Sequence, residues 1–193
     1  MKKIVFATNN KHKLKEVSLY LKNRYEVISL NALGFHQDIP EPFDTLEENA
    51  LTKSQTIFDK YQLDCFSDDT GLEVEALNGA PGVFSARYAG EGCSFSDNVE
   101  KMLREMQGQE NRKARFRTVV SLILKGEKHF FEGIVNGRIA EDETGTDGFG
   151  YDPIFIPEGY DISFAEMDLD EKNKISHRGR AMAKLVAFLK TID

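Results

Sequence analysis

Hydrophobic and polar positions along this chain alternate between runs typical of strands and runs typical of helices. An apolar run over residues 3–8 predicts a buried strand, and the spacing of Leu14, Val17 and Leu21 predicts the helix that follows it. A second strand is expected over 25–30. This strand–helix–strand order is typical of an α/β protein.

The rest of the chain continues in the same way. The further predicted elements are a helix from Thr45, strands over 65–72 and 73–77, a helix over 97–107, a hairpin of 113–124 with 129–135, and a last helix that opens over 171–180. A hairpin inside a strand–helix alternation predicts a mixed, rather than purely parallel, α/β sheet. The chain has 193 residues, 40% of them hydrophobic, and shows no repeat or linker, which predicts a single domain over 1–193.

The strand over 65–72 carries two adjacent acids, Asp68 and Asp69, followed by Thr70 and Gly71. We expect the acids at the tip of the strand, with Gly71 allowing the backbone to turn. Because side chains alternate along a strand, one acid is expected to be available to a metal while its neighbour braces the loop. A solvated acidic turn is the alternative.

Charge and cysteine content limit the classes of partner. The chain has 32 acidic and 25 basic residues, and its formal charge of -7 opposes binding to a nucleic acid polymer. The first apolar run stops at Ala7, short of a signal peptide, and no stretch reaches a membrane-spanning length. The two cysteines, Cys65 and Cys93, are expected to be free thiols in a reducing compartment. We expect a cytoplasmic protein that binds no membrane.

A polar turn follows the first strand and opens the first helix. Backbone N–H groups, the positive end of a helix and lysines converge there, which favours a phosphate. The residues of this turn are Thr8, Asn9, Asn10, Lys11, His12 and Lys13. Ordinary helix capping by Asn or Thr is the alternative, and no Walker-type glycine loop is present.

Three further stretches carry candidate binding residues. Arg87, in the glycine-rich segment 80–90, could bind a phosphate or pair with a surface acid. In the glycine-rich loop 145–152, Phe149 or Tyr151 could stack on a base or simply pack. A basic cluster near the start of the last helix suits an anion. Its members are Lys172, Lys174, His177, Arg178 and Arg180.

Six motifs spread from residue 4 to residue 181 carry a resemblance to a known family. They are Ala7-Thr-Asn-Asn-Lys-His-Lys, Glu48-Asn-Ala with Lys53, Ser67-Asp-Asp-Thr-Gly-Leu, Gly79-Ala-Pro-Gly-Val-Phe-Ser-Ala-Arg-Tyr-Ala-Gly, Gly148-Phe-Gly-Tyr-Asp-Pro and Glu171-Lys-Asn-Lys-Ile-Ser-His-Arg-Gly. In this order they resemble the Ham1 family, also called inosine triphosphate pyrophosphatases.

The resemblance implies a fold and an activity. The fold would be an elongated α/β structure with a mixed, twisted central sheet, flanking helices and two lobes around a cleft. The activity would be Mg²⁺-dependent hydrolysis of non-canonical purine nucleoside triphosphates, such as ITP, dITP and XTP, to the monophosphate and pyrophosphate. Such an enzyme cleanses the nucleotide pool, and the family is usually homodimeric.

The resemblance also implies roles for single residues. Asp69 matches the acid regarded as general base and metal ligand, and Glu41 is the best match for the second metal ligand, although the loop around it varies in the family. The triphosphate would be held by Thr8, Asn9, Asn10, Lys11, His12, Lys13, Lys53, Thr70 and Arg87. The base would lie against Phe149 in the loop with Gly150, Tyr151 and Asp152, with Lys172, His177 and Arg178 around its edge.

Hydrogen-bond polarity explains the expected selectivity. Hypoxanthine and xanthine present a carbonyl at C6, which His177 or Arg178 can satisfy, whereas the amino group of adenine would leave those donors unpaired. Guanine shares the carbonyl, and the sequence does not indicate how GTP is excluded. A non-catalytic purine nucleotide sensor and a pyrophosphatase for modified pyrimidines are the alternatives. An aspartyl phosphatase is disfavoured because Asp68-Asp69 lacks the Asp-x-Asp spacing.

Overall fold

The structure, a computed structural model, describes residues 1–22 and 24–192, which group into two compact units. Each unit is assembled from separate segments of the chain. The first unit contains Met1–Asp69, Thr118–Gly133 and the chain from Arg178 on, and the second contains Thr70–Arg117 and Ile134–His177. The chain therefore passes between the units several times, and β3, β5 and β6 each contribute residues to both.

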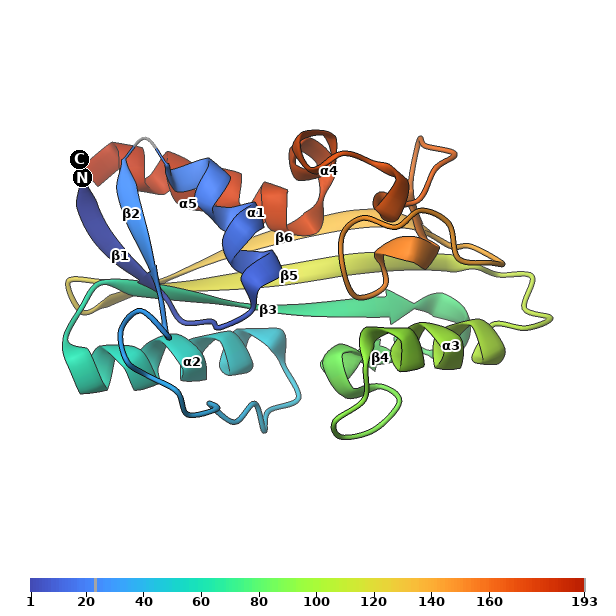
Figure 1. Cartoon of the computed structure of the whole chain (residues 1–193), viewed down its shortest axis with the longest axis horizontal. Helices are drawn as coiled ribbons and strands as arrows, with labels where there is room; N and C mark the ends of the chain where they lie inside the picture. Colours follow the sequence, from blue (N-terminus) through green and yellow to red (C-terminus); the bar gives the residue numbers. More distant parts are fainter. Residues whose placement is uncertain (23, 193) are drawn as a thin grey trace. The chain divides into compact units, whose positions relative to one another are not determined.

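Seven strands and five α-helices are assigned within the described residues (Figure 1). The strands are β1 (Lys2–Phe6), β2 (Tyr25–Ser29), β3 (Cys65–Val74), β4 (Pro81–Gly82), β5 (Lys113–Leu124), β6 (Glu127–Ile139) and β7 (Phe155–Pro157). The helices are α1 (Lys11–Leu21), α2 (Leu46–Tyr61), α3 (Phe95–Glu105), α4 (Leu169–Ile175) and α5 (His177–Ile192). Across residues 1–22 and 24–192, no helix combines the length and the apolar character needed to cross a membrane.

The strands form one mixed sheet in the order β2-β1-β3-β5-β6-β7, with β4 paired to β3. β1 runs parallel to β2 and β3, whereas β4 is antiparallel to β3 and β7 is antiparallel to β6. β5 and β6 are joined by the tight turn Lys125–Gly126, where both residues have positive φ. The predicted mixed α/β sheet and its hairpin are confirmed.

Alternating side chains of β1 supply two cores in the first unit. Ile4 and Phe6 pack with apolar residues of α1 and α5 on one face, and Val5 packs with residues of α2 on the other (Figure 1). The ring of Phe6 stacks on that of Phe66 in β3 at 4.5 Å between centroids. Helices on both faces of a parallel strand pair explain why β1 reads as a continuous apolar run.

The second unit has its own core, built around aromatic rings and one amphipathic helix. The rings of Phe116 and Phe155 lie 4.6 Å apart between centroids, and Phe164 packs beside both. Val99 and Met102, three residues apart on α3, face the same core. The apolar side of α3 is therefore part of this core.

Three details of the predicted elements are wrong. β3 continues through Gly71 to Val74, so Asp68 and Asp69 lie within the strand rather than at its tip. Gly71 is required for close approach, because a Cβ there would lie 2.8 Å from the carbonyl oxygen of Gly82. The predicted strand over 73–77 gives way to a 3₁₀ turn at Glu75–Leu77.

The helix boundaries also differ from the predicted ones. α3 begins at Phe95, two residues earlier than predicted, because Ser94 forms a capping box with Asp97. The last helical stretch is two helices, α4 and α5, separated by Ser176, whose ψ of 157° is extended. Thr45 caps α2 through the N–H of Glu48, as the sequence predicts.

Candidate functional site

The turn between β1 and α1 is held by its own side chains. Asn10 caps α1, and its Oδ1 accepts the backbone N–H groups of His12 at 2.9 Å and Lys13 at 3.1 Å. The Thr8 hydroxyl accepts the N–H of Asn10 at 3.2 Å, and Asn9 Oδ1 accepts an N–H from the loop after β2 at 2.8 Å. Helix capping, the alternative left open above, is therefore present, and phosphate binding by this turn stays a prediction.

Asp68 on β3 is held through both of its carboxylate oxygens. Its Oδ1 accepts Lys13 Nζ at 2.9 Å, and its Oδ2 accepts Arg178 Nε at 3.0 Å. Arg178 also donates from Nη1 to Glu16 Oε2 at 2.5 Å. Two positive and two negative side chains thus pair inside the first unit, which offsets the cost of burying them. Asp68 is the bracing acid, because it ties β3 to α1 and α5.

Asp69, the next residue on β3, faces a different set of partners. Lys53 on α2 pairs with Glu41 from the loop before that helix, and Lys53 Nζ lies 3.8 Å from Asp69 Oδ1. Successive side chains of a strand point to opposite faces, which explains how neighbouring acids reach separate partners. The structure therefore brings together Glu41, Lys53 and Asp69, which lie in three different segments of the sequence.

The two neighbouring acids have pKa values shifted in opposite directions. Burial raises the pKa of Asp69 to about 6, although the positive charge of Lys53 opposes that rise. Burial would also raise the pKa of Asp68, but Lys13 and Arg178 together outweigh it and hold the pKa well below its usual range. Asp69 is thus the acid of this pair that gains or loses a proton close to neutral pH.

The residues around Asp69 fit a magnesium ion that arrives with a polyphosphate. Glu41 and Asp69 already lie against one cation, the ammonium of Lys53. Mg²⁺ is commonly bound through one or two carboxylates together with substrate phosphates. In the described part of the chain, no group of three or more His, Cys, Asp or Glu side chains could hold a metal by itself. Glu41 and Asp69 therefore suit a site in which Mg²⁺ is bound by protein and polyphosphate together, rather than one made of protein ligands alone.

In the second unit, the loop predicted to contact the base is bound tightly around Asp152. Asp152 Oδ2 accepts the N–H of Phe149 at 2.8 Å and the ammonium of Lys172 at 2.7 Å. Gly148 has φ +77°, and a Cβ at that position would collide with the Asp152 carboxylate. Gly150 also has a positive φ, of 65°. The backbone that carries Phe149 is thereby fixed.

Lys172 and His177 lie against aromatic rings of the second unit. Lys172 Nζ is 5.2 Å from the centre of the half-buried Phe149 ring and 5.7 Å from that of Phe164. The His177 ring stacks on Phe116 at 4.5 Å with an interplanar angle of 19°. Both Lys172 and His177 are buried. The structure therefore brings together Phe149 and Lys172 from the set predicted for the base.

Four other predicted residues have separate surroundings. Tyr151 is buried, and its hydroxyl donates to a backbone carbonyl at 2.8 Å, so this ring packs within the second unit. Arg87 Nε lies 3.6 Å from Glu91 Oε1 in a surface pair. Thr70 is half-buried on β3, and Lys11 is exposed at the start of α1. The roles of these residues toward a substrate stay predictions.

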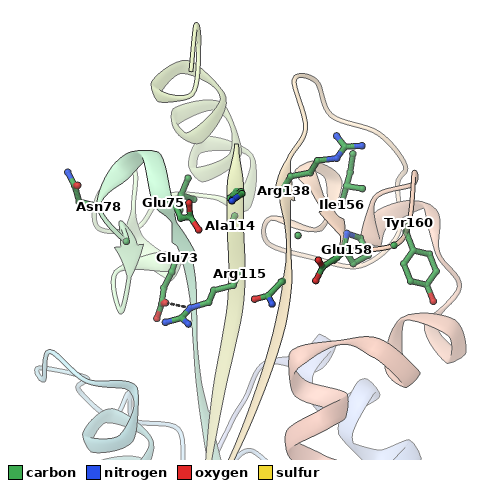
Figure 2. A pocket seen from close by; sticks show the side chains of 16 residues that line it. Glu73, Glu75, Asn78, Ala114, Arg115, Arg138, Ile156, Glu158 and Tyr160 are labelled. Atoms are coloured by element: carbon green, nitrogen blue, oxygen red, sulfur yellow. Dashed lines mark hydrogen bonds and ion pairs between the residues drawn. The ribbon is translucent and has the colours of Figure 1, made fainter. Parts of the chain in front are cut away.

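A groove of about 840 Å³ lies in the second unit, and none of the predicted site residues lines it (Figure 2). Its charged lining consists of Glu73, Glu75, Lys113, Arg115, Arg138 and Glu158. Figure 2 shows the Glu73 carboxylate facing the Arg115 guanidinium, and these groups lie 2.6 Å apart. Three acids balance three bases, so the groove has no excess positive charge for a triphosphate.

One residue of the buried network escaped the sequence analysis. Glu16 lies three positions after Lys13 on α1, and is buried against Arg178. Adjacent residues of a helix lie about 100° apart, so Glu16 falls off the apolar stripe of Leu14, Val17 and Leu21, and no local signal in the sequence indicates that it is buried. The position of its partner Arg178, in a distant helix, carries no local signal either.

The sequence and the fold of this chain are similar to those of known proteins. The sequence profile of the Ham1 family matches residues 4–188. A relative from Porphyromonas gingivalis named dITP/XTP pyrophosphatase is 53% identical over 190 residues, which cover 98% of each chain. One of the same name from Flavobacterium psychrophilum is 50% identical over 97% of this chain and 98% of its own. A solved HAM1 protein from Coxiella burnetii, 36% identical, superposes with a TM-score of 0.90 over 99% of this chain and 100% of its own.

Proposed function

This chain belongs to the Ham1 family, and from that premise we propose that it hydrolyses non-canonical purine nucleoside triphosphates such as ITP, dITP and XTP. The products are the nucleoside monophosphate and pyrophosphate, and the activity cleanses the nucleotide pool. The observation that carries the proposal is the nearly full-length match to relatives named dITP/XTP pyrophosphatases. The arrangement of charged side chains in the first unit supports it.

Asp69 is proposed as the general base. Its pKa of about 6 leaves it ionised above neutral pH yet basic enough to accept a proton from the attacking water. Glu41 and Asp69 are proposed to hold Mg²⁺, which, when bound, neutralises phosphate charge and polarises the phosphorus under attack. Lys53 has a raised pKa, because Asp69 and Glu41 outweigh the effect of its burial, so it carries its positive charge throughout the working range.

The triphosphate is proposed to bind through hydrogen-bond donors and positively charged side chains. Lys13 and Lys53 are held in place by carboxylates, so they meet a phosphate without first being ordered. The full set proposed for the phosphates is Thr8, Asn9, Asn10, Lys11, His12, Lys13, Lys53, Thr70 and Arg87. Positive charge at these positions stabilises the pyrophosphate as it leaves.

The base is proposed to stack on Phe149, with donors at its edge. The half-buried ring of Phe149 and its tightly held backbone support this role, and Lys172 beside it supplies a donor. The other residues proposed for the base are Gly150, Tyr151, Asp152, His177 and Arg178. Donors at the C6 position favour the carbonyl of hypoxanthine or xanthine over the amino group of adenine.

A product assay separates this proposal from its rivals. Wild type and Asp69→Asn are incubated with Mg²⁺ and ITP, XTP, dITP, GTP or ATP, and pyrophosphate is distinguished from orthophosphate. We expect pyrophosphate from ITP, dITP and XTP, little from ATP, and a loss in the variant of at least about 100-fold. Orthophosphate as the product would favour a phosphatase, and tight ITP binding without turnover would favour a nucleotide sensor.

The assembly and location of the protein are also proposals. The family resemblance supports a homodimer, which light scattering of the purified chain would measure directly as twice the mass of 21.8 kDa. Cys65 and Cys93 are free thiols in the structure, which suits the reducing cytoplasm that we propose. The acidic charge of -7 supports the absence of a nucleic acid polymer among its partners.

A further inference from the structure

Phe95 is a large apolar side chain left exposed beside the ring proposed to stack on the base. It is the first residue of α3, and 45% of its surface is exposed. Its ring lies 5.9 Å from the ring of Phe149 between centroids, with an interplanar angle of 50°. Tilted aromatic pairs at this separation attract each other, so the partly exposed Phe95 ring lies in contact with the Phe149 ring.

The backbone on which Phe95 stands is well fixed. Ser94 and Asp97 form the capping box of α3, with Ser94 N–H donating to Asp97 Oδ2 at 2.7 Å and Asp97 N–H donating to Ser94 Oγ at 3.1 Å. Asn98 on the same helix accepts the N–H of Ala89 at 2.8 Å. These bonds hold the backbone at the start of α3 and so fix the position from which the Phe95 side chain projects.

We propose that Phe95 is a specificity-determining residue that extends the stacking surface of Phe149 so that it covers a bicyclic base. The inference rests on the proposed role of Phe149 in the hydrolysis of purine nucleoside triphosphates. A purine is larger than one phenyl ring, so it projects beyond Phe149 and reaches a second ring set at an angle to the first. A pyrimidine has one ring and gains less from that second contact.

Steady-state kinetics on ITP test this role. We expect Phe95→Ala to raise the KM for ITP about 10-fold, within the range for loss of one base–aromatic contact, and to change kcat by less than about twofold. Phe130→Ala is the matched control, because Phe130 is 47% exposed on β6 and belongs to the first unit. A KM for Phe95→Ala that equals the control value, while Phe149→Ala raises it, would overturn the role of Phe95 alone.

The Phe149→Ala variant distinguishes a wrong base site from a wrong role for Phe95 alone. If neither Phe149→Ala nor Phe95→Ala changes the KM for ITP, the proposed base site itself is wrong, and the inference about Phe95 is overturned with it. Turnover of ITP by the wild type would still stand in that case. If both variants raise KM and keep kcat, the base site and its extension are both supported.

A binding measurement avoids dependence on turnover. The chain contains no tryptophan, so Phe95→Trp introduces a single indole while keeping an aromatic ring at the position. We expect IMP to quench its fluorescence in a saturable way and UMP to do so only at about 10-fold higher concentration. The fluorescence of Phe130→Trp, the control variant, should change with neither nucleotide. Equal quenching by IMP and UMP, or none by IMP at concentrations that inhibit wild-type turnover, would contradict the proposal.

Discussion

Glu41 and Asp69 lie against the same ammonium group, that of Lys53. Glu41 is ion-paired with Lys53, and Asp69 Oδ1 lies 3.8 Å from Lys53 Nζ. A single cation thus balances two carboxylates that would otherwise repel each other in a largely buried setting. If a phosphate of the proposed substrate took up the charge of Lys53, the two carboxylates would suit the divalent cation proposed for this site.

Removing one of these acids should weaken the use of Mg²⁺. Glu41→Gln keeps the shape of the side chain and removes its charge, so we expect the Mg²⁺ concentration for half-maximal activity to rise by at least about 10-fold. Titration of pyrophosphate release against Mg²⁺ measures this value. Asp59→Asn, an exposed acid at the far end of α2, is the control and should match the wild type. An unchanged Mg²⁺ dependence in Glu41→Gln would exclude Glu41 as a ligand.

The raised pKa of Asp69 predicts a rise in activity with pH. Below its pKa of about 6 the carboxyl is protonated, and it can neither bind Mg²⁺ nor accept a proton from water. We therefore expect activity at subsaturating Mg²⁺ to rise about tenfold per pH unit below pH 6 and to level off above it. The measurement is the initial rate of pyrophosphate release from pH 5 to pH 9. A flat profile would show that Asp69 does not titrate in this range.

Lys53 provides a second check on this assignment. Its positive charge lowers the pKa of Asp69, so Lys53→Met should move the rise in activity to higher pH. Normalised profiles separate this shift from any general loss of activity. Lys60→Met removes an exposed charge from the same helix and should leave the profile in place. A shift toward acid pH in Lys53→Met would contradict the electrostatic explanation.

Asp68 should matter for stability as well as for the site. Asp68→Asn removes the charge that pairs with Lys13 and Arg178 but keeps the size of the side chain. Breaking a buried pair in this way costs about 3–5 kcal/mol of unfolding free energy. Denaturant unfolding at pH 7 measures the change, with Asp59→Asn as the exposed control, expected within about 0.5 kcal/mol of wild type. A similarly small effect at Asp68 would mean that the network contributes little.

The sign of the pH dependence follows from the depressed pKa of Asp68. A carboxyl whose folded pKa lies below its ordinary value of 3.8 stabilises the protein fully above that value. The stabilisation is lost as pH falls through the folded pKa. The difference in unfolding free energy between wild type and Asp68→Asn should therefore shrink below pH 4. A difference that grows in acid would contradict the pairing.

Much of the fold follows from local sequence, because hydrophobic periodicity and capping residues act within a few positions. β1, α2 and the β5–β6 hairpin lie close to their predicted ranges for that reason. The continuation of β3 through Gly71 does not follow from local sequence, because it depends on the approach of Gly82 from a separate strand. A glycine that permits close contact is indistinguishable in sequence from one that permits a turn.

Sequence motifs named the residues that the structure gathers around Asp68 and Asp69, except Glu16, but they did not indicate how these residues pair. Asp68 and Asp69 are adjacent, yet only the folded chain shows that Lys13 and Arg178 hold one while Lys53 lies beside the other. Alternation along a strand predicts that the two acids point to opposite faces of the sheet, but it does not indicate which of them ties the strand to neighbouring elements. The residue types came from motifs, whereas their partners come from segments that meet only in the tertiary structure.

Arg178 links this buried network to the predicted selectivity for the base. A guanidinium has five N–H donors, and the bonds from Nε to Asp68 and from Nη1 to Glu16 fix its plane. A donor with a fixed orientation discriminates a carbonyl from an amino group better than a mobile one, because it cannot turn away from the wrong partner. The carboxylates that brace Arg178 thereby favour its proposed role at the edge of the base.

Arg178→Ala should therefore reduce the preference for ITP over ATP. Loss of a donor to the C6 carbonyl lowers kcat/KM for ITP by about 10- to 100-fold and has a much smaller effect on ATP, so the ratio between the two substrates falls. Parallel kinetics on ITP and ATP measure that ratio, and Arg115→Ala, which removes a guanidinium from the groove of the second unit, is the control. Glu16→Gln keeps a hydrogen-bond acceptor for Arg178 and should show a smaller change in the same direction. An equal loss on both substrates would mean that Arg178 acts only as a brace for Asp68, and that another donor reads the base.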